Sequence, residues 1–356
     1  MTLPASGNPI SFSQVDVELG YSATAQISMN DTAVRTLFGV ASGAIGMSSG
    51  FGKSNASYLC ITTSGACVTT SGNYKIAKWT GSGSFSVNSL GSGVGNAGNH
   101  INYLVVAGGG SGYKSACSGG GGAGGVRNDC SGICCSGGAS VAVGSYPITV
   151  GGGGTASAAR SSGGSGSSSL LSCLVGTATY GGAGQACSST GAKNGGSGGG
   201  ASPKNVGGVG GAGTSGQGYA GGTGGYCICS CYLISLGGGG GGASASGGCG
   251  GVVGGGYSGG VGGAGRSISF LSATYGGGGG GGTFNCKAGF YTSGAVGGSG
   301  GGGHGALCNS NGQKANATAG GANTGGGGGG GVGSTSIGAC GANGGSGIVA
   351  IRWRFK

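Results

Sequence analysis

The chain has 356 residues, of which 107 are glycine, and it carries a formal net charge of +11. So much glycine leaves little side-chain volume for a conventional core, while four prolines and no strict period of three exclude a collagen triple helix. The lysines and arginines form neither a stripe nor an arginine–glycine repeat, which argues against a nucleic-acid-binding protein.

Residues 1–55 differ from the rest of the chain, because they hold three of the four acidic residues and the only helix-like patterns. Ser11 and the glutamine three residues later form a capping box, and Gly20 stands where a C-terminal cap belongs. Asn30 and Gly39 are predicted to bound a second short helix in the same way. Helices of about two turns are marginal alone. We therefore predict that 1–55 is an N-terminal docking segment.

Strand-like alternation of apolar and polar residues begins after this segment. It occurs at 74–79 and 83–87, within residues 56–100, which we predict to be a small β region. The alternation continues at 101–107, 141–150, 169–180 and 347–355. In the last of these, one face holds Val349, Ile351, Trp353 and Phe355, which predicts a half-buried final strand.

Long glycine tracts alternate with segments that are richer in side chains. The tracts are 237–242, 276–282 and 325–331, and the richer segments are 113–119, 126–135, 186–194, 226–236, 284–293 and 307–318. A tract in the polyproline-II conformation has three residues per turn and no internal hydrogen bonds, so seven glycines span roughly 22 Å and bond only to neighbouring tracts. Residues 101–356 are therefore predicted to be mainly β with polyglycine-II helices, as a glycine-rich sandwich or bundle framed by short strands. Solvated flexible linkers are the alternative.

The order of these segments is familiar. The succession GSFSV, INYLVVAGGGSG, YPITVGGGG, TATYGGAG, ANTGGGGGGG and GGSGIVAIRWRF resembles the glycine-rich domain of tail proteins of tailed bacteriophages, from about residue 80 to the end. The opening LPASGNPISFSQVDVELG is similar to the N-terminal segment of many phage virion proteins. The resemblance implies a virion tail fibre or fibre-tip adhesin, in which polyglycine-II helices are the scaffold and the loops between them contact the host receptor.

The resemblance also implies partners and a location. Residues 1–55 would bind other tail or baseplate proteins, and the loops would bind a glycan or an outer-membrane protein of the host cell. We expect a homo-oligomer, a trimer, in the particle, with synthesis in the host cytoplasm and a role outside the cell. Two alternatives stay open: a purely structural virion component, such as a fibre shaft or tail decoration, and an extracellular glycine-rich matrix or ice-binding protein.

Groups for catalysis are sparse. Beyond residue 31, Asp129 is the only acidic residue, so the two carboxylates needed for glycoside hydrolysis are missing. His100 and His304 have no acidic residue nearby in sequence to complete a Ser-His-Asp arrangement. We predict that the protein is not an enzyme and needs no cofactor.

Receptor contact is expected from exposed aromatic residues with a cation nearby. The candidates are Tyr113, Lys114, Tyr226, Tyr232, Phe290, Tyr291 and Lys314. For each of them, packing within its own loop is the alternative.

The 15 cysteines are numerous for a cytosolic domain, and YCICSCY would place three of them on one face of an extended stretch. Neither C-x-x-C spacing nor a second pair at zinc-finger distance is present there, so we expect disulfides or buried thiols and no metal. The predicted cluster comprises Cys117, Cys130, Cys134, Cys135, Cys227, Cys229, Cys231 and Cys249.

Overall fold

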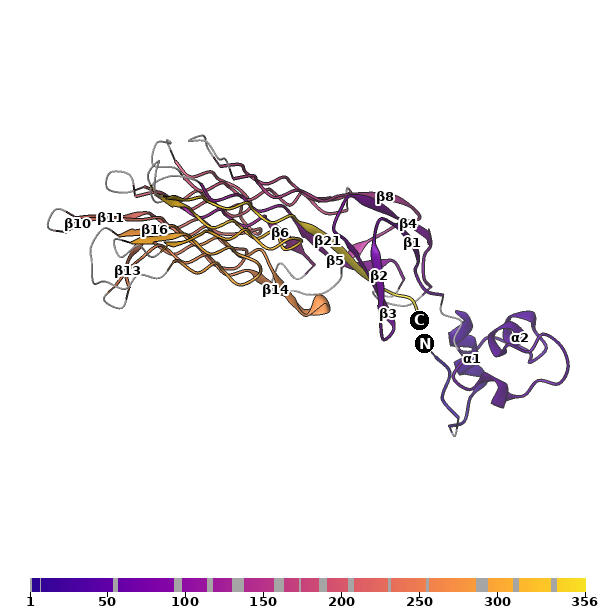
Figure 1. Cartoon of the computed structure of the whole chain (residues 1–356). Helices are drawn as coiled ribbons and strands as arrows, with labels where there is room; N and C mark the ends of the chain where they lie inside the picture. Colours follow the sequence, from indigo (N-terminus) through magenta and orange to yellow (C-terminus); the bar gives the residue numbers. More distant parts are fainter. Residues whose placement is uncertain are drawn as a thin grey trace.

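The computed structural model describes residues 2–6, 8–53, 57–92, 98–113, 118–129, 138–156, 163–172, 174–185, 191–203, 208–229, 232–253, 256–285, 294–309, 314–333 and 338–356. The protein is mainly β, with short strands in several sheets. Two helices and both chain termini lie at one end of an elongated molecule, which we call the base (Figure 1). The opposite end, which we call the far end, carries β10 (Gly225–Cys229), β11 (Tyr232–Leu236), β13 (Gly256–Ser258) and β16 (Thr283–Asn285).

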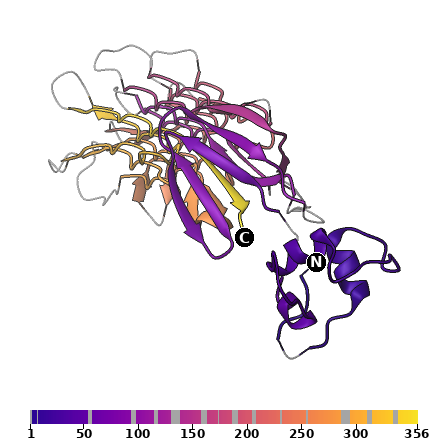
Figure 2. The same cartoon turned by 90° about the vertical axis from the view of Figure 1, so that its right-hand side faces the viewer.

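The N-terminal unit contains α1 (Phe12–Leu19), α2 (Thr32–Phe38) and a 3-10 turn, η1 (Met47–Gly50). The predicted capping box of α1 is confirmed: the Ser11 hydroxyl accepts from Gln14 N at 3.3 Å, and Gln14 Oε1 accepts from Ser11 N at 2.8 Å. Gly20 ends the helix with φ 84°. Because this unit buries its own cluster of apolar residues, it packs as a separate small body beside the sheets (Figure 2); the cluster contains Leu3, Val15, Val34, Leu37 and Phe38.

The start of α2 differs from the prediction. Its N-cap is Asp31, one residue after the expected Asn30, and Asp31 makes no side-chain bond to the helix. The Asn30 side chain is engaged elsewhere, since its Oδ1 accepts from Arg35 Nη2 at 2.6 Å. Gly39 closes the helix with φ 73°, as predicted.

Two sheets cover the base. In the larger sheet, β7 (Ala139–Ser140) pairs with β5, and the order of the other strands is β2 (Cys67–Ser71), β3 (Tyr74–Trp79), β21 (Ile348–Arg354), β5 (His100–Val106) and β6 (Val126–Asn128). The order in the smaller sheet is β1 (Cys60–Ser64), β4 (Gly83–Ser89), β8 (Gly144–Thr149) and β9 (Leu170–Leu171).

These pairings correct the predicted domain boundary at residue 100. Within the region 56–100, β3 pairs with β21, with Trp79 opposite Val349, and β4 pairs with β8, with Phe85 opposite Tyr146. A two-stranded hairpin is marginal by itself, so these strands gain stability by joining later parts of the chain. The region 56–100 is therefore part of the same body as the glycine-rich segments.

The core of the base lies between the two sheets and includes Trp79, Phe85 and Ile101, all at most 1 % exposed. Three residues of β21 that were predicted to share a face, Val349, Ile351 and Trp353, are buried in this core. The opposite face of β21 is also covered at its start, because Ile348 and Ala350 belong to a second cluster with Leu104, Val126 and Ile268.

The remaining strands are short. A five-stranded sheet has the order β10, β11, β16, β17 (Leu307–Asn309) and β18 (Lys314–Ala315). Three two-stranded ribbons join β12 (Gly251–Val253) to β13, β14 (Arg266–Ile268) to β15 (Ala273–Tyr275), and β19 (Val332–Gly333) to β20 (Gly338–Ala339). A 3-10 turn, η2 (Ser269–Leu271), lies between β14 and β15.

Between the base and the far end, the glycine-rich segments bond to one another around a central segment, 118–125. Each backbone N–H of this segment donates to a carbonyl oxygen elsewhere in the chain. Donors three residues apart reach the same neighbour: Ser118, Gly121 and Gly124 donate to Gly331, Gly328 and Gly325, at 2.8 to 3.0 Å. Segments that exchange hydrogen bonds with 118–125 surround it on all sides: 107–110, 179–185, 197–200, 237–242, 276–282 and 325–331.

The three long tracts are packed in the same way. Gly237 N and Gly240 N donate to Gly282 O and Gly279 O, both at 2.8 Å, so 237–242 and 276–282 run antiparallel side by side. The glycines of all three tracts are buried. Within the described residues, the glycine tracts are thus ordered scaffold segments and not solvated linkers.

The chain passes back and forth between the two ends. At the base it reverses in described turns at 215–217, 299–301 and 322–325 and in a bend at 243–245. At the far end, the residues that end one segment lie beside the residues that end or begin another. Gly331 N donates to Tyr113 O at 2.9 Å, and Gly282 N donates to Ser118 O at 2.9 Å. The described ends of outgoing and returning segments therefore meet at the far end.

Candidate functional site

The far end collects most of the side-chain-rich segments that the sequence analysis singles out. Five of them begin and end beside tracts that reach this end: 113–119, 186–194, 226–236, 284–293 and 307–318. The segment 126–135 is an exception, because it begins with β6, which pairs with β5 at the base. Val126 is fully buried there with Leu104. The resemblance implies that these segments are receptor-facing loops, but the described residues 126–129 of this segment lie at the base.

Tyr113 was expected to be an exposed receptor anchor, but its side chain is 1 % exposed. Its carbonyl oxygen accepts from the Ser118 hydroxyl and from Gly331 N. Tyr113 therefore packs the far end of the scaffold, because a large ring at the end of a glycine tract can fill the space that glycines leave open.

The other predicted anchors are placed only in part. Lys314 is exposed in β18, opposite Cys308 of β17. Tyr226 and Tyr232 lie in the β10–β11 hairpin, whose backbone alone is described. Lys114, Phe290 and Tyr291 lie outside the described residues.

The cysteine-rich stretch forms a hairpin and not one extended strand. Cys229 of β10 is the register partner of Tyr232 of β11, so the chain reverses between them. Of the predicted cluster, Cys249 is a free and exposed thiol. The side chains of the remaining members lie outside the described residues: Cys117, Cys130, Cys134, Cys135, Cys227, Cys229 and Cys231.

The groups considered for catalysis have structural contacts. The Asp129 carboxylate accepts from Asn102 Nδ2, and His100 Nε2 lies 3.1 Å from the Ser140 hydroxyl. His304 Nδ1 accepts from Gly297 N at 3.4 Å. Burial and the neighbouring Asp129 raise the pKa of Tyr103 above its ordinary 10.0. Among the described residues, no group of histidine, cysteine and acidic side chains could hold a metal ion.

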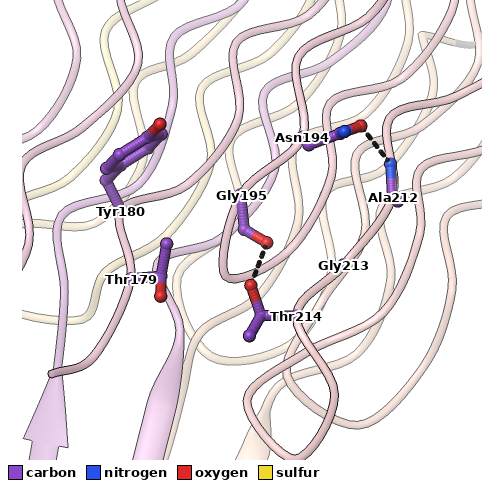
Figure 3. A pocket seen from close by; sticks show the side chains of 7 residues that line it. All are labelled: Thr179, Tyr180, Asn194, Gly195, Ala212, Gly213 and Thr214. Carbon is purple, nitrogen blue, oxygen red and sulfur yellow. Dashed lines mark hydrogen bonds between the residues drawn. The ribbon is translucent and has the colours of Figure 1, made fainter. Parts of the chain in front are cut away.

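One cavity lies where three glycine-rich segments meet (Figure 3). Its volume is about 310 Å³, and it is lined by Thr179, Tyr180, Asn194, Gly195, Ala212, Gly213 and Thr214. None of these residues was a candidate in the sequence analysis. The sequence contains one indication of this cavity, since TATYGGAG places Tyr180 where a strand-like run meets glycines.

Hydrogen bonds tie the walls of this cavity together. Thr214 Oγ1 donates to Gly195 O at 2.9 Å, and Ala212 N donates to Asn194 Oδ1 at 2.8 Å. Gly195 and Gly213 also form a parallel bridge. The arrangement joins neighbouring segments around an opening whose lining carries no charged side chain.

Comparison with known protein families identifies the glycine-rich part of the chain. No curated protein matches the chain. No helix in the described ranges is long and apolar enough to cross a membrane. A family model described as a glycine-rich domain matches residues 91–354, which is well over half of the sequence. The chain therefore belongs to the glycine-rich domain family.

Proposed function

We propose that this protein is a tail fibre or fibre-tip adhesin in the virion of a tailed bacteriophage. Its N-terminal unit would dock onto other tail or baseplate proteins, and its far-end loops would bind a glycan or an outer-membrane protein on the host cell. One observation carries the proposal: the glycine-rich scaffold separates the helical unit at the base from the side-chain-rich segments at the far end (Figure 1). The resemblance of the N-terminal and glycine-rich sequences to phage tail proteins supports it.

We also infer that the packed tracts are polyglycine-II helices. Two features of the hydrogen bonds support this conformation. Residues three apart in 118–125 donate hydrogen bonds to the same neighbouring segment. This spacing is the repeat of a helix with three residues per turn. The same segment bonds outward to six neighbours, as a helix without internal hydrogen bonds must do to satisfy its backbone.

Glycine is required for this packing because the segments touch through their backbones. A Cβ added at Gly121 or Gly240 would lie closer than 3.0 Å to a carbonyl group of the adjacent segment. A side chain within an inner tract would therefore push neighbouring segments apart. On this proposal the receptor-binding sequences lie outside the packed tracts, so they could change to suit another receptor while the scaffold stays the same.

The N-terminal unit suits a docking role because it is built separately. Its apolar cluster contains only residues of the first 47 positions, while the cluster between the base sheets begins at Leu59. The unit also lies at the end opposite the proposed receptor-binding loops (Figures 1 and 2). A contact made by the unit with the tail would leave the far end directed away from the particle.

Phage particles that carry altered chains test the receptor role. Residues 286–293 and 310–313 would be replaced by glycine–serine segments of equal length. The matched control replaces 130–137, which connect β6 to β7 at the base. We expect host adsorption to fall for the far-end replacements and to stay unchanged for the control, with equal amounts of the chain in all particles. Unchanged adsorption in every variant would instead favour the purely structural component.

Removal of residues 2–53 tests the docking role. We expect particles to lack the chain, as measured by immunoblotting of purified virions, while the remaining body folds with an unchanged circular dichroism spectrum. If the truncated chain is still incorporated, docking through the N-terminal unit is wrong.

A further inference from the structure

We propose that the cavity beside Tyr180 binds one neutral sugar ring, independently of the far-end loops. The cavity lies where three parts of the chain meet: 179–180, 194–195 and 212–214 (Figure 3). At about 310 Å³ it is at the small end of ligand cavities, which suits a single ring better than an extended chain.

The chemistry of the lining selects the class of ligand. A sugar ring has an apolar C–H face and a rim of hydroxyls, so its site needs a flat apolar wall and nearby hydrogen-bonding groups. Tyr180 supplies the wall: its side chain is 40 % exposed, and its ring stands at one side of the cavity, with Asn194 and Thr214 across from it (Figure 3). Because no lysine, arginine or acidic residue lines the cavity, an uncharged ring fits better than a charged one.

The polar groups around the cavity keep hydrogen-bonding capacity after their internal bonds are made. Asn194 uses Oδ1 to accept from Ala212 N, which leaves its amide N–H groups as donors. Thr214 donates its hydroxyl proton to Gly195 O, which leaves the Oγ1 lone pairs as acceptors. The hydroxyls of Thr179 and Tyr180 make no hydrogen bond to another residue of the described ranges, and each can donate or accept. Sugar hydroxyls, which both donate and accept, match this mixture.

The cavity is held in shape before any ligand arrives. Gln217, which is 3 % exposed, accepts from Thr179 N at 2.7 Å and donates to Thr177 O at 3.3 Å. Gly196 N donates to Tyr180 O at 2.7 Å, which fixes the backbone under the aromatic ring. Few groups would need to be ordered on binding, so a small ligand would retain most of its interaction energy.

The test is a titration of the purified full-length chain with methyl α-glucopyranoside, methyl β-galactopyranoside and methyl α-mannopyranoside, followed by amide chemical shifts in NMR spectra. We expect at least one of them to shift the amides of Gly195 and Gly213, with a Kd of about 1 to 10 mM. Tyr180→Ala should weaken this binding about tenfold or more, while Tyr180→Phe, which keeps the ring, should bind within about threefold of the unaltered chain.

The matched control is Tyr219→Ala, because Tyr219 is 50 % exposed and does not line the cavity. It should bind as the unaltered chain does, and spectra of all variants should agree away from the substituted site. The proposal is overturned if none of the three sugars shifts these amides at about 100 mM, if Tyr180→Ala binds undiminished, or if glucuronate binds much more tightly than the neutral rings. Since the assay uses neither particles nor host cells, its outcome is separate from that of the adsorption experiment.

Discussion

Replacing Gly327 by alanine tests whether the inner glycine segments must approach through bare backbones. A Cβ at Gly327 would lie closer than 3.0 Å to the carbonyl group of Gly121 and to the amide nitrogen of Gly279. These are backbone atoms of two other buried segments, and neither can rotate away as a flexible side chain would. The matched control is Gly152→Ala, because Gly152 is exposed and a Cβ there meets no atom within 4 Å.

The expected magnitudes follow from these contacts. Overpacking costs about 1–3 kcal/mol, and we expect at least about 3 kcal/mol for Gly327→Ala because backbone on two sides is displaced. At Gly152 the only effect is a loss of freedom in the unfolded chain, which stabilises by about 0.4–1 kcal/mol. The free energies of unfolding of the two variants should therefore differ by about 3–4 kcal/mol. At roughly 2 °C per kcal/mol for a domain of this size, their melting temperatures should differ by about 6–8 °C.

Differential scanning calorimetry of the two variants and the unaltered chain measures this difference. Gly240→Ala serves as a second inner site, since its Cβ would also lie closer than 3.0 Å to the Gly121 carbonyl. Both inner variants should have lower melting temperatures than Gly152→Ala. Equal melting temperatures for inner and outer variants would mean that the tracts do not pack backbone to backbone, and the scaffold described here would be refuted.

Three further predictions concern single groups. Burial raises the pKa of Tyr275 above its ordinary 10.0, so the unfolded chain loses the phenol proton at a lower pH than the folded chain does. The free energy of unfolding should therefore fall as the pH rises past 10.0. Denaturant titrations over this pH range should show a smaller fall for Tyr275→Phe. Under native conditions iodoacetamide should modify the exposed Cys249 rapidly and Cys308, which is 5 % exposed, only slowly. Peptide mass spectra measure both rates, and equal rates would contradict the packing of β17. Ser11→Ala should destabilise the N-terminal unit by about 0.5–2 kcal/mol through loss of the capping box, and limited proteolysis should show faster cleavage there but not in the glycine-rich body.

Local patterns of sequence predicted several elements well. The alternation at 74–79 coincides with β3, and the apolar face of 347–355 agrees with the buried face of β21. The capping box of α1 was also predicted correctly. These features depend on side chains a few residues apart, which is why they can be read without knowing the fold.

Other predictions failed where the tertiary structure overrides the local pattern. In the described part of the run 169–180 the only strand is the two-residue β9, because the chain turns at Ser172, whose φ is 46°. The segment 118–125 was not predicted to be a tract, although it is the segment around which the others pack. Its interruptions by serine and alanine made it look less regular than the uninterrupted glycine runs.

The cavity beside Tyr180 could not have been predicted from the residues that line it. They come from three segments that are brought together by hydrogen bonds such as Thr214 to Gly195, between residues that no sequence pattern connects. The burial of Tyr113 depends likewise on which segments end beside it.

The amino-acid sequence by itself determined which segments can pack as bare backbone, where the strands of the base lie, and how α1 begins and ends. Only the tertiary structure decided which tract neighbours which, that β6 belongs to the base, and that 56–100 shares its sheets with residues as distant as β21. The reason is physical. A glycine tract has no side chains with which to specify a partner, so its neighbours are chosen by the backbone hydrogen bonds and connections of the whole bundle.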